Sequence, residues 1–239
     1  MTVRSAALLA TVLLGASVAG QFVLAARRQG EGAASTEGAL AALGGLRSFA
    51  AEMVWFRADR LQQEGKYAEL AQLASTLTAL EPHTPEVWCY SAWNLAYNVS
   101  VMMPDEEGRW RWVKAGMSLL RDRGLALNPE SPDLCRDLAW LFEVKIGADI
   151  DAASPHYRRR WRETVEDVAR RDAWGELRMD RARMRDIERR YGFSDWTNPM
   201  LSAIYWAELG LQRARGQTRA FLQEIIRQSV GIYPKIGQM

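Results

Sequence analysis

The sequence has few of the residues from which metal, redox and nucleotide sites are built. Only two cysteines, Cys89 and Cys135, occur in 239 residues, and their separation supports neither a zinc ribbon nor a redox dithiol. The two histidines, His83 and His156, have no second ligand at a metal-binding spacing. The chain also lacks a glycine-rich phosphate loop and a Gly-x-Ser-x-Gly nucleophile turn. We therefore expect no metal, no cofactor and no enzymatic activity.

An excess of charge of one sign is absent as well. Lysine and arginine total 31, aspartate and glutamate total 29, and the two signs are mixed along the chain. A general nucleic-acid binder carries a dominant basic patch, so we expect no nucleic-acid partner. Asp149 and Asp151 suggest a calcium loop, but the glycine and the final glutamate of such a loop are missing.

No segment of the chain alternates polar and apolar residues with a period of two, which argues against strands. From Leu46 onward, apolar residues instead recur at spacings of three and four, as at Leu70, Leu73, Leu77 and Leu80. This period is that of an amphipathic helix. The sequence predicts an all-α domain in which both cysteines are small, buried side chains near helix starts.

A long uncharged stretch, residues 6–26, precedes this domain. As a helix it would be about 30 Å long, which is enough to cross the core of a bilayer. A cleavable signal peptide would use the same stretch, with a cleavage site at Ser17-Val-Ala19. We favour an uncleaved anchor over residues 1–28, because the apolar run continues past that site to Arg27-Arg28. Residues 29–45, composed largely of Gly, Ala, Ser and Glu, are typical of a flexible linker.

The orientation in the membrane depends on the residues that flank the uncharged stretch. Arg4 lies on one side and Arg27-Arg28 on the other, so the positive-inside rule does not decide it. A short N-terminal tail before a large domain usually leads to export of that domain. We therefore expect a single-pass membrane protein whose soluble domain faces the outer, periplasmic or extracytoplasmic, side.

One phrase occurs twice in the domain, as Leu80-Glu-Pro-His-Thr-Pro85-Glu-Val-Trp88 and as Leu127-Asn-Pro-Glu-Ser-Pro132-Asp-Leu-Cys135. In each copy the first proline ends a helical pattern, and the second falls in the first turn of the next helix. Repetition of this kind is typical of stacked helical hairpins, whose extended surfaces bind partners.

These residues resemble the tetratricopeptide-repeat (TPR) family. Residues 65–82 are similar to that family's inter-helix turn, second helix and closing proline, and Val87-Trp88 is similar to the start of a first helix. The resemblance covers residues 46–147 and implies a solenoid of helical hairpins with a peptide-binding groove lined by the first helices. The small residues that let the two helices of a repeat approach closely would be Ala58, Ala92 and Ala139.

The chain departs from the family pattern in two regions. About a dozen extra residues in the second repeat indicate an insertion near residues 98–112. Residues 148–239 lose the pattern. There we expect a helix from Ser154-Pro155, an arginine-rich stretch divided into two helices, and a final hairpin from Asn198-Pro199 that caps the stack as a divergent fourth repeat.

The first helix of the second repeat supplies the predicted binding groove. Its aromatic rings offer contact area, and its asparagine can hydrogen-bond a peptide backbone. The candidate residues are Trp88, Trp93, Asn94 and Tyr97. The insertion adds a candidate rim of the residue types that dominate binding hot spots, Arg109, Trp110, Arg111 and Trp112. The alternative for Trp110 is that it packs inward as the next helix starts.

A basic cluster, Arg158-Arg-Arg-Trp-Arg162, has two interpretations. It either contacts anionic lipid headgroups or an acidic partner, or it forms a solvated helix face. Glu163, Glu166 and Asp167 follow within two turns, which favours the solvated face.

Three functions are compatible with these patterns. The first is a membrane-anchored, non-enzymatic adaptor that binds a protein or peptide in its groove and helps to assemble a membrane complex. The second is a permanent structural subunit of such an assembly with no exchangeable ligand. The third is an enzyme whose site has no recognisable sequence signature.

Overall fold

The structure is a computed structural model in which residues 50–236 are described. The chain divides into two compact units, Met1–Phe56 and Arg57–Met239; of the first unit, residues 50–56 are described and are helical. The predicted anchor and linker lie outside the described residues. Within those residues, no helix is both long enough and apolar enough to cross a membrane.

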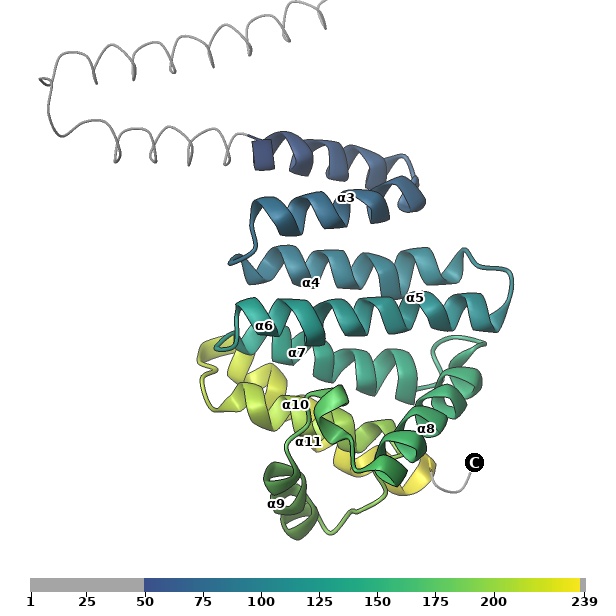
Figure 1. Cartoon of the computed structure of the whole chain (residues 1–239), viewed down its shortest axis with the longest axis vertical. Helices are drawn as coiled ribbons and strands as arrows, with labels where there is room; N and C mark the ends of the chain where they lie inside the picture. Colours follow the sequence, from purple (N-terminus) through teal and green to yellow (C-terminus); the bar gives the residue numbers. More distant parts are fainter. Residues whose placement is uncertain (1–49, 237–239) are drawn as a thin grey trace, which may run out of the picture. The chain divides into compact units, whose positions relative to one another are not determined.

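The second unit is helical throughout its described part, with no strand among residues 57–236, which confirms the predicted all-α class. Three of its long helices include a π-helical segment, an uncommon feature that is frequent at functional sites. After a helix that ends at residue 63, the elements are α3 (Tyr67–Leu80), α4 (Pro85–Trp93) with η1 (Asn94–Val99), α5 (Glu106–Ser118) with η2 (Leu119–Gly124) and α6 (Leu125–Leu127), α7 (Pro132–Trp140) with η3 (Leu141–Gly147), α8 (Ser154–Arg171), the 3₁₀ turn η4 (Trp174–Leu177), α9 (Arg181–Tyr191), α10 (Pro199–Leu211) and α11 (Gly216–Ile236) (Figure 1).

Proline and side-chain caps start these helices where the sequence predicts. Pro85, Pro132 and Pro199 each stand in the first turn of a helix, where no backbone N–H is needed. Ser131 accepts a hydrogen bond from the backbone N–H of Leu134, so one otherwise unpaired donor is satisfied. The Asn198 side chain caps α10 in the same way.

The two copies of the repeated phrase form adjacent turns that bond to each other. The Pro82 carbonyl accepts one hydrogen bond from the Asn128 side-chain amide at 2.8 Å and another from the Trp88 indole at 2.9 Å. The turn between α10 and α11 lies next in the series, since Arg213 forms an ion pair with Glu130. All three turns lie on the same side of the second unit (Figure 1).

The helices of the second unit pack in an order that differs from the chain order. α3 packs on the helix formed by α4 and η1. That helix packs in turn on the helix formed by α5 and η2, and α7 packs on α4 and η2. The helix with the most extensive packing against α7 and η3 is α10, whereas α8 packs on η3 and α5. α10 therefore occupies the position of the second helix of a third hairpin with α7, and it packs most extensively on α11, the helix that follows it in the chain.

Small residues let the backbones of α4 and α5 approach closely. Ala58, Ala92 and Ala139 are fully buried. A Cβ atom added at Gly116 of α5 would lie 2.7 Å from the Ala92 carbonyl oxygen. The expected role of Ala92 in close helix packing is thus confirmed.

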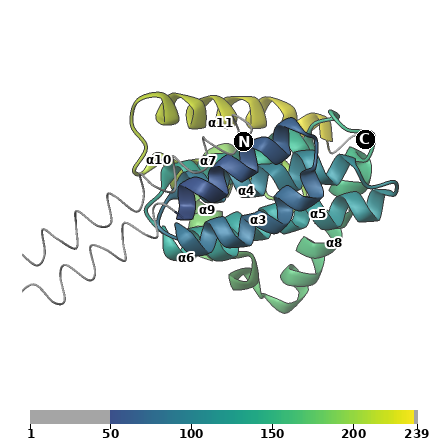
Figure 2. The ribbon, with the colours of Figure 1, turned by 90° about the horizontal axis from the view of Figure 1, so that it is seen from above.

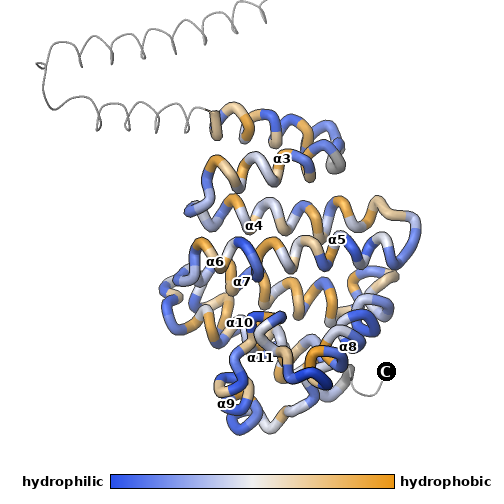
Figure 3. Tube along the Cα trace, viewed as in Figure 1, coloured by the Kyte–Doolittle hydropathy of each residue, from blue (hydrophilic) through white to orange (hydrophobic). Residues whose placement is uncertain are grey.

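The segment from α8 to α9 is an excursion between the two helices of the third hairpin. α8 packs on α5 and η3, and the Phe142 ring meets the edge of the buried Trp161 ring at 4.7 Å between centroids. Hydrophilic residues predominate along α9 and much of α8 (Figure 3). Arginine–carboxylate pairs lie along both helices, among them Asp167–Arg171, Asp167–Arg170 and Asp186–Arg190.

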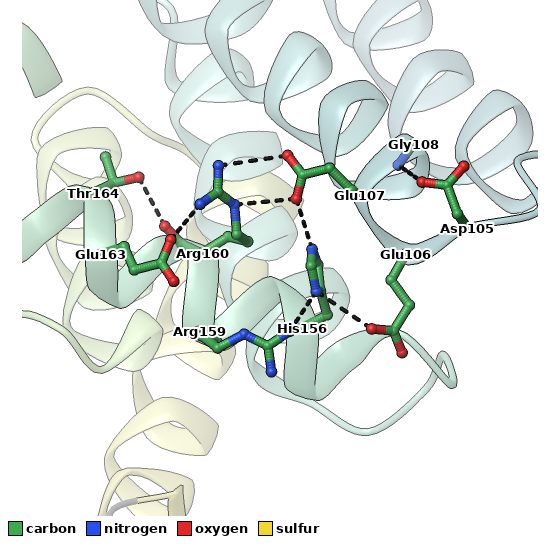
Figure 4. A network of polar contacts seen from close by, with 9 residues as sticks. All are labelled: Asp105, Glu106, Glu107, Gly108, His156, Arg159, Arg160, Glu163 and Thr164. Carbon is green, nitrogen blue, oxygen red and sulfur yellow. Dashed lines mark hydrogen bonds and ion pairs between the residues drawn. The ribbon is translucent and has the colours of Figure 1, made fainter.

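A polar network fastens the start of α8 to the start of α5 (Figure 4). Glu107 Oε2 lies 3.0 Å from Nε2 of His156 and 3.2 Å from Nε of Arg160. Arg159 lies 2.7 Å from Nδ1 of His156. Glu106 Oε2 lies 3.3 Å from the same Nδ1, so the imidazole is held between two carboxylates of α5 and one arginine of α8.

We expect Gly116→Ala to lower the free energy of unfolding by about 1–3 kcal/mol, because the new methyl group overpacks the contact with Ala92. The control is Gly231→Ala in α11, where an added Cβ meets no atom within 4 Å. Chemical denaturation of both variants checks this. Equal effects would show that helix propensity, and not close packing, decides the outcome.

We expect Glu107→Ala to loosen α8 from α5. The carboxylate is half exposed, so the loss of stability should be small, about 1 kcal/mol. Amide hydrogen exchange in the first turns of α8 should become faster. The control is Glu163→Ala, which removes an Arg160 partner located on α8 itself. Unchanged exchange in the Glu107 variant would contradict the role of this network.

Candidate functional site

Three aromatic rings from two consecutive first helices stack in a row. Trp93 ends α4, and Tyr97 follows one turn later in η1; their ring centroids are 5.8 Å apart with 20° between the planes. Tyr97 stacks in turn on Trp140, the last residue of α7, at 5.5 Å and 22°. These separations are those of favourable offset stacking. Trp93, Tyr97 and Trp140 are called the aromatic row below.

The aromatic row is held in place but not covered. Trp93 is 38% exposed, and Tyr97 and Trp140 are partly buried against the core. A fixed, solvent-accessible tryptophan loses little conformational entropy on binding and is a frequent hot spot of protein interfaces. The row therefore has the properties of a binding surface.

The helix α11 borders the carboxylates beside this row. The Thr218 hydroxyl donates to Asp133 Oδ1 at 3.0 Å, and further along both helices Glu224 lies near Glu143. α7 with η3 and α11 therefore run in the same direction. In the view from above, α11 and α3 lie on opposite sides of α4 (Figure 2).

A buried carboxyl group, Glu143, lies behind the aromatic row. The residue is only 3% exposed, and the carboxyl oxygen Oε1 has no hydrogen-bond partner in the described part of the chain. Burial, and then the charge of Glu224, raise the pKa of Glu143 to about 7. Burial also raises the pKa of the Tyr97 hydroxyl, with further contributions from the charges of Asp137 and Glu143. The Tyr97 hydroxyl likewise has no hydrogen-bond partner among residues 50–236.

A second buried charge, Lys145, is fully paired. Its Nζ lies 2.8 Å from Asp151 and within 5.6 Å of the ring centroids of Tyr97 and Tyr157. Burial favours the neutral form of Asp151, but hydrogen bonds from Lys145, Tyr157 and the backbone N–H of Ala153 outweigh it and lower its pKa to about 2. Asp151 therefore holds the loop after η3 in place. Its interactions are those of a structural residue.

The cysteines are inert in this environment. Burial raises the pKa of the Cys135 thiol to about 12. Burial and then the nearby Asp137 raise the pKa of the Cys89 thiol even further. Both thiols are buried and free, as expected for small core residues.

The predicted groove residues fall into two groups. Trp93 and Tyr97 lie together in the aromatic row. Trp88 and Asn94 are only 3% and 2% exposed, so their expected role as ligand contacts is wrong. The Trp88 indole N–H donates a hydrogen bond to the Pro82 carbonyl, and the Asn94 side-chain oxygen accepts one from the Asn98 amide at 3.1 Å.

The sequence reasoning missed Trp140 and Glu143. A signal for Trp140 exists: it follows Pro132 at the same distance as Trp93 follows Pro85, so the repeat places both at the end of a first helix. No sequence signal marks Glu143, because its burial depends on the neighbouring helices.

The predicted rim residues lie on α5 and do not join the aromatic row. Trp110 is 2% exposed and its ring lies 6.2 Å from that of Tyr157 in α8, so the inward-packing alternative is confirmed. Arg109 pairs with Asp151 at 3.2 Å. Arg111 is exposed and Trp112 is partly buried.

The basic cluster is largely neutralised within the chain. Arg158 pairs with Asp149 at 2.7 Å, and Arg160 pairs with Glu107 and Glu163. The solvated-face interpretation is therefore the better one for these arginines. Trp161, in the middle of the cluster, is buried in the core.

A cavity of about 330 Å³ lies between α5 with η2 and α8 with η4. Two of its arginines are already paired, Arg121 with Asp122 and Arg171 with Asp167. Its lining residues are Trp110, Lys114, Met117, Arg121, Thr164, Asp167, Val168, Arg171, Glu176 and Leu177.

Among the residues that the structure describes, no three or more histidine, cysteine, aspartate or glutamate side chains are grouped so as to hold a metal ion. No family model, no curated protein and no solved structure matches this chain. The geometry of the aromatic row is therefore the main evidence on function.

We expect Glu143→Gln to change how stability depends on pH. The pKa of this carboxyl rises from 4.5 to about 7 on folding, so the folded state holds its proton more tightly. Stability should then fall as pH rises from about 4.5 to about 7, by roughly 1–3 kcal/mol. Denaturation of the glutamine variant over this range should show a flatter curve and greater stability near pH 8. Glu163→Gln, on the surface of α8, serves as the control. If the two variants gave the same curve, Glu143 would not be the group that titrates.

Proposed function

We propose that the protein is a non-enzymatic adaptor that binds a protein or peptide through the aromatic row and thereby helps to assemble a membrane complex. The observation that carries the proposal is the stacked, partly exposed set of rings on consecutive first helices. The resemblance of residues 46–147 to TPR repeats supports it, because first helices line the peptide-binding groove of that family.

The contact pattern of the second unit is compatible with a TPR-like solenoid. Successive helices form hairpins, the repeated turns bond to one another, and α11 runs parallel to α7 in the manner of a further first helix. The excursion from α8 to α9 is an addition to that arrangement. In this proposal, the α8–α9 segment packs against α5 and leaves the face of α4 and α7 that carries the aromatic row accessible.

The membrane part of the proposal rests on the sequence. Residues 6–26 would provide a single-pass anchor, and residues 29–45 would let the domain reach partners near the membrane surface. The domain would face the outer side. Clustering beside the membrane raises the effective concentration of the adaptor for membrane-bound partners.

The alternative is a permanent structural subunit of a membrane assembly. The exposed, adjacent Val101 and Met102 favour it, because they extend the apolar surface beyond the aromatic row at the end of the same helix. Such a subunit would bury both regions in one stable interface.

We expect Trp93→Ala to weaken capture of the partner at least about tenfold, since a central aromatic anchor is worth about 2 kcal/mol or more. The measurement is crosslinking and mild-detergent capture of the tagged full chain from its native membranes, with quantitative mass spectrometry. Ile150→Ala is the control, because it removes an exposed apolar side chain that is not part of the row. A circular-dichroism melt confirms that each variant is folded.

The two candidate functions predict different outcomes of this experiment. A partner lost in the Trp93 variant and retained in the Ile150 variant supports the adaptor. A stoichiometric assembly that survives both changes supports the structural subunit. Equal loss in both variants would contradict a role for the aromatic row.

A further inference from the structure

The buried Glu143 carboxyl, beside the aromatic row, is costly to the folded protein as it stands. Buried charged groups are normally paired and hydrogen-bonded. Glu143 is only 3% exposed, yet its Oε1 has no hydrogen-bond partner in the described part of the chain. An arrangement of this kind is expected where a ligand completes the pairing.

The surroundings of Glu143 do not supply a counter-charge. Lys145, the nearest lysine along the helix, is turned to Asp151 at 2.8 Å. Arg136 is shared between Asp133 and Asp137, and Arg227 of α11 is paired with Glu224. Arg136 and Arg227 are thus already engaged by Asp133, Asp137 and Glu224, and neither guanidinium group is free to pair with Glu143.

The aromatic row adds a second feature that suits a cation. Lysine and arginine side chains are attracted to the faces of tryptophan and tyrosine rings within about 6 Å. The chain already shows this contact, because Lys145 Nζ lies 5.3 Å from the centroid of the Tyr97 ring. Trp93, at the exposed end of the row, has a ring face that no cation of the described residues is seen to cover.

We propose that the partner presents a basic peptide segment, whose lysine or arginine side chain ion-pairs with Glu143 while the adjoining residues lie across Trp93 and Trp140. This inference rests on the proposed function and specifies the chemistry of the partner. The long, apolar stem of a lysine or arginine can lie against the exposed Trp93 ring, and its charged end would complete the pairing of Glu143.

The test measures peptide retention by the purified full chain, immobilised in mild detergent. The probes are four libraries of short random peptides that differ only in a fixed central residue, which is lysine, arginine, glutamine or glutamate. At about pH 8 we expect the lysine and arginine libraries to be retained about tenfold more than the glutamine library. At about pH 5.5, where Glu143 holds its proton, this preference should shrink.

Two variants separate this inference from the proposed function. Glu143→Gln should remove the preference for basic peptides and leave retention of the glutamine library unchanged, whereas Trp93→Ala should weaken retention of every library. Glu163→Gln, remote from the row, should behave as the unmodified chain does.

The opposing results are equally specific. Retention that depends on Trp93 but is equal for all four libraries, or a preference for the glutamate library, overturns the inference and leaves the adaptor function standing. Retention of no library by the unmodified chain counts against both. If the Glu143→Gln variant still preferred basic peptides, that preference would come from other carboxylates, and the inference would be overturned.

Discussion

The stacking of the hairpins depends on a turn that bonds to its neighbour. The Pro82 carbonyl oxygen accepts two side-chain hydrogen bonds. One comes from the Trp88 indole in the following helix, and the other comes from the Asn128 amide in the following turn. These two bonds fix the start of α4 and the spacing to the next repeat at once. In the second copy Cys135 stands where the first has Trp88, and that turn is joined to the next by the Glu130–Arg213 ion pair instead. Trp93 and Trp140 then lie at corresponding places, since each ends a helix that starts from such a turn, and Tyr97 stacks between them.

Close backbone packing gives this arrangement its second constraint. Gly116 leaves no room for a methyl group against Ala92, so α4 and α5 are held at a distance that bulkier side chains would not allow. The third hairpin keeps the scheme although its second helix, α10, comes some fifty residues after η3 in the chain. The intervening α8 and α9 are attached to the side by the Glu107–His156 network and by the buried Trp161.

The candidate site combines exposed rings with a buried acid, and the two are linked through Tyr97. Its ring joins Trp93 to Trp140, while its hydroxyl lies near enough to Glu143 for the charge to raise its pKa. An uncompensated carboxyl group in this position lowers stability at neutral pH. Proteins tolerate such groups chiefly at functional sites, where a ligand offsets the cost. The same physical fact thus underlies both the stability prediction for Glu143 and the proposed basic partner.

The all-α class, the starts of α4, α7, α8 and α10 and the burial of the cysteines follow from the sequence alone, because proline, capping residues and helical periodicity act locally. The sequence also pointed to Trp93 and Tyr97, which lie together in the aromatic row. Tertiary structure decided what local patterns do not encode: that Trp88 and Asn94 turn inward, that α10 pairs with α7, and that Glu143 is buried without a partner. Burial and charge pairing depend on residues distant in the chain, which only the packed helices bring together.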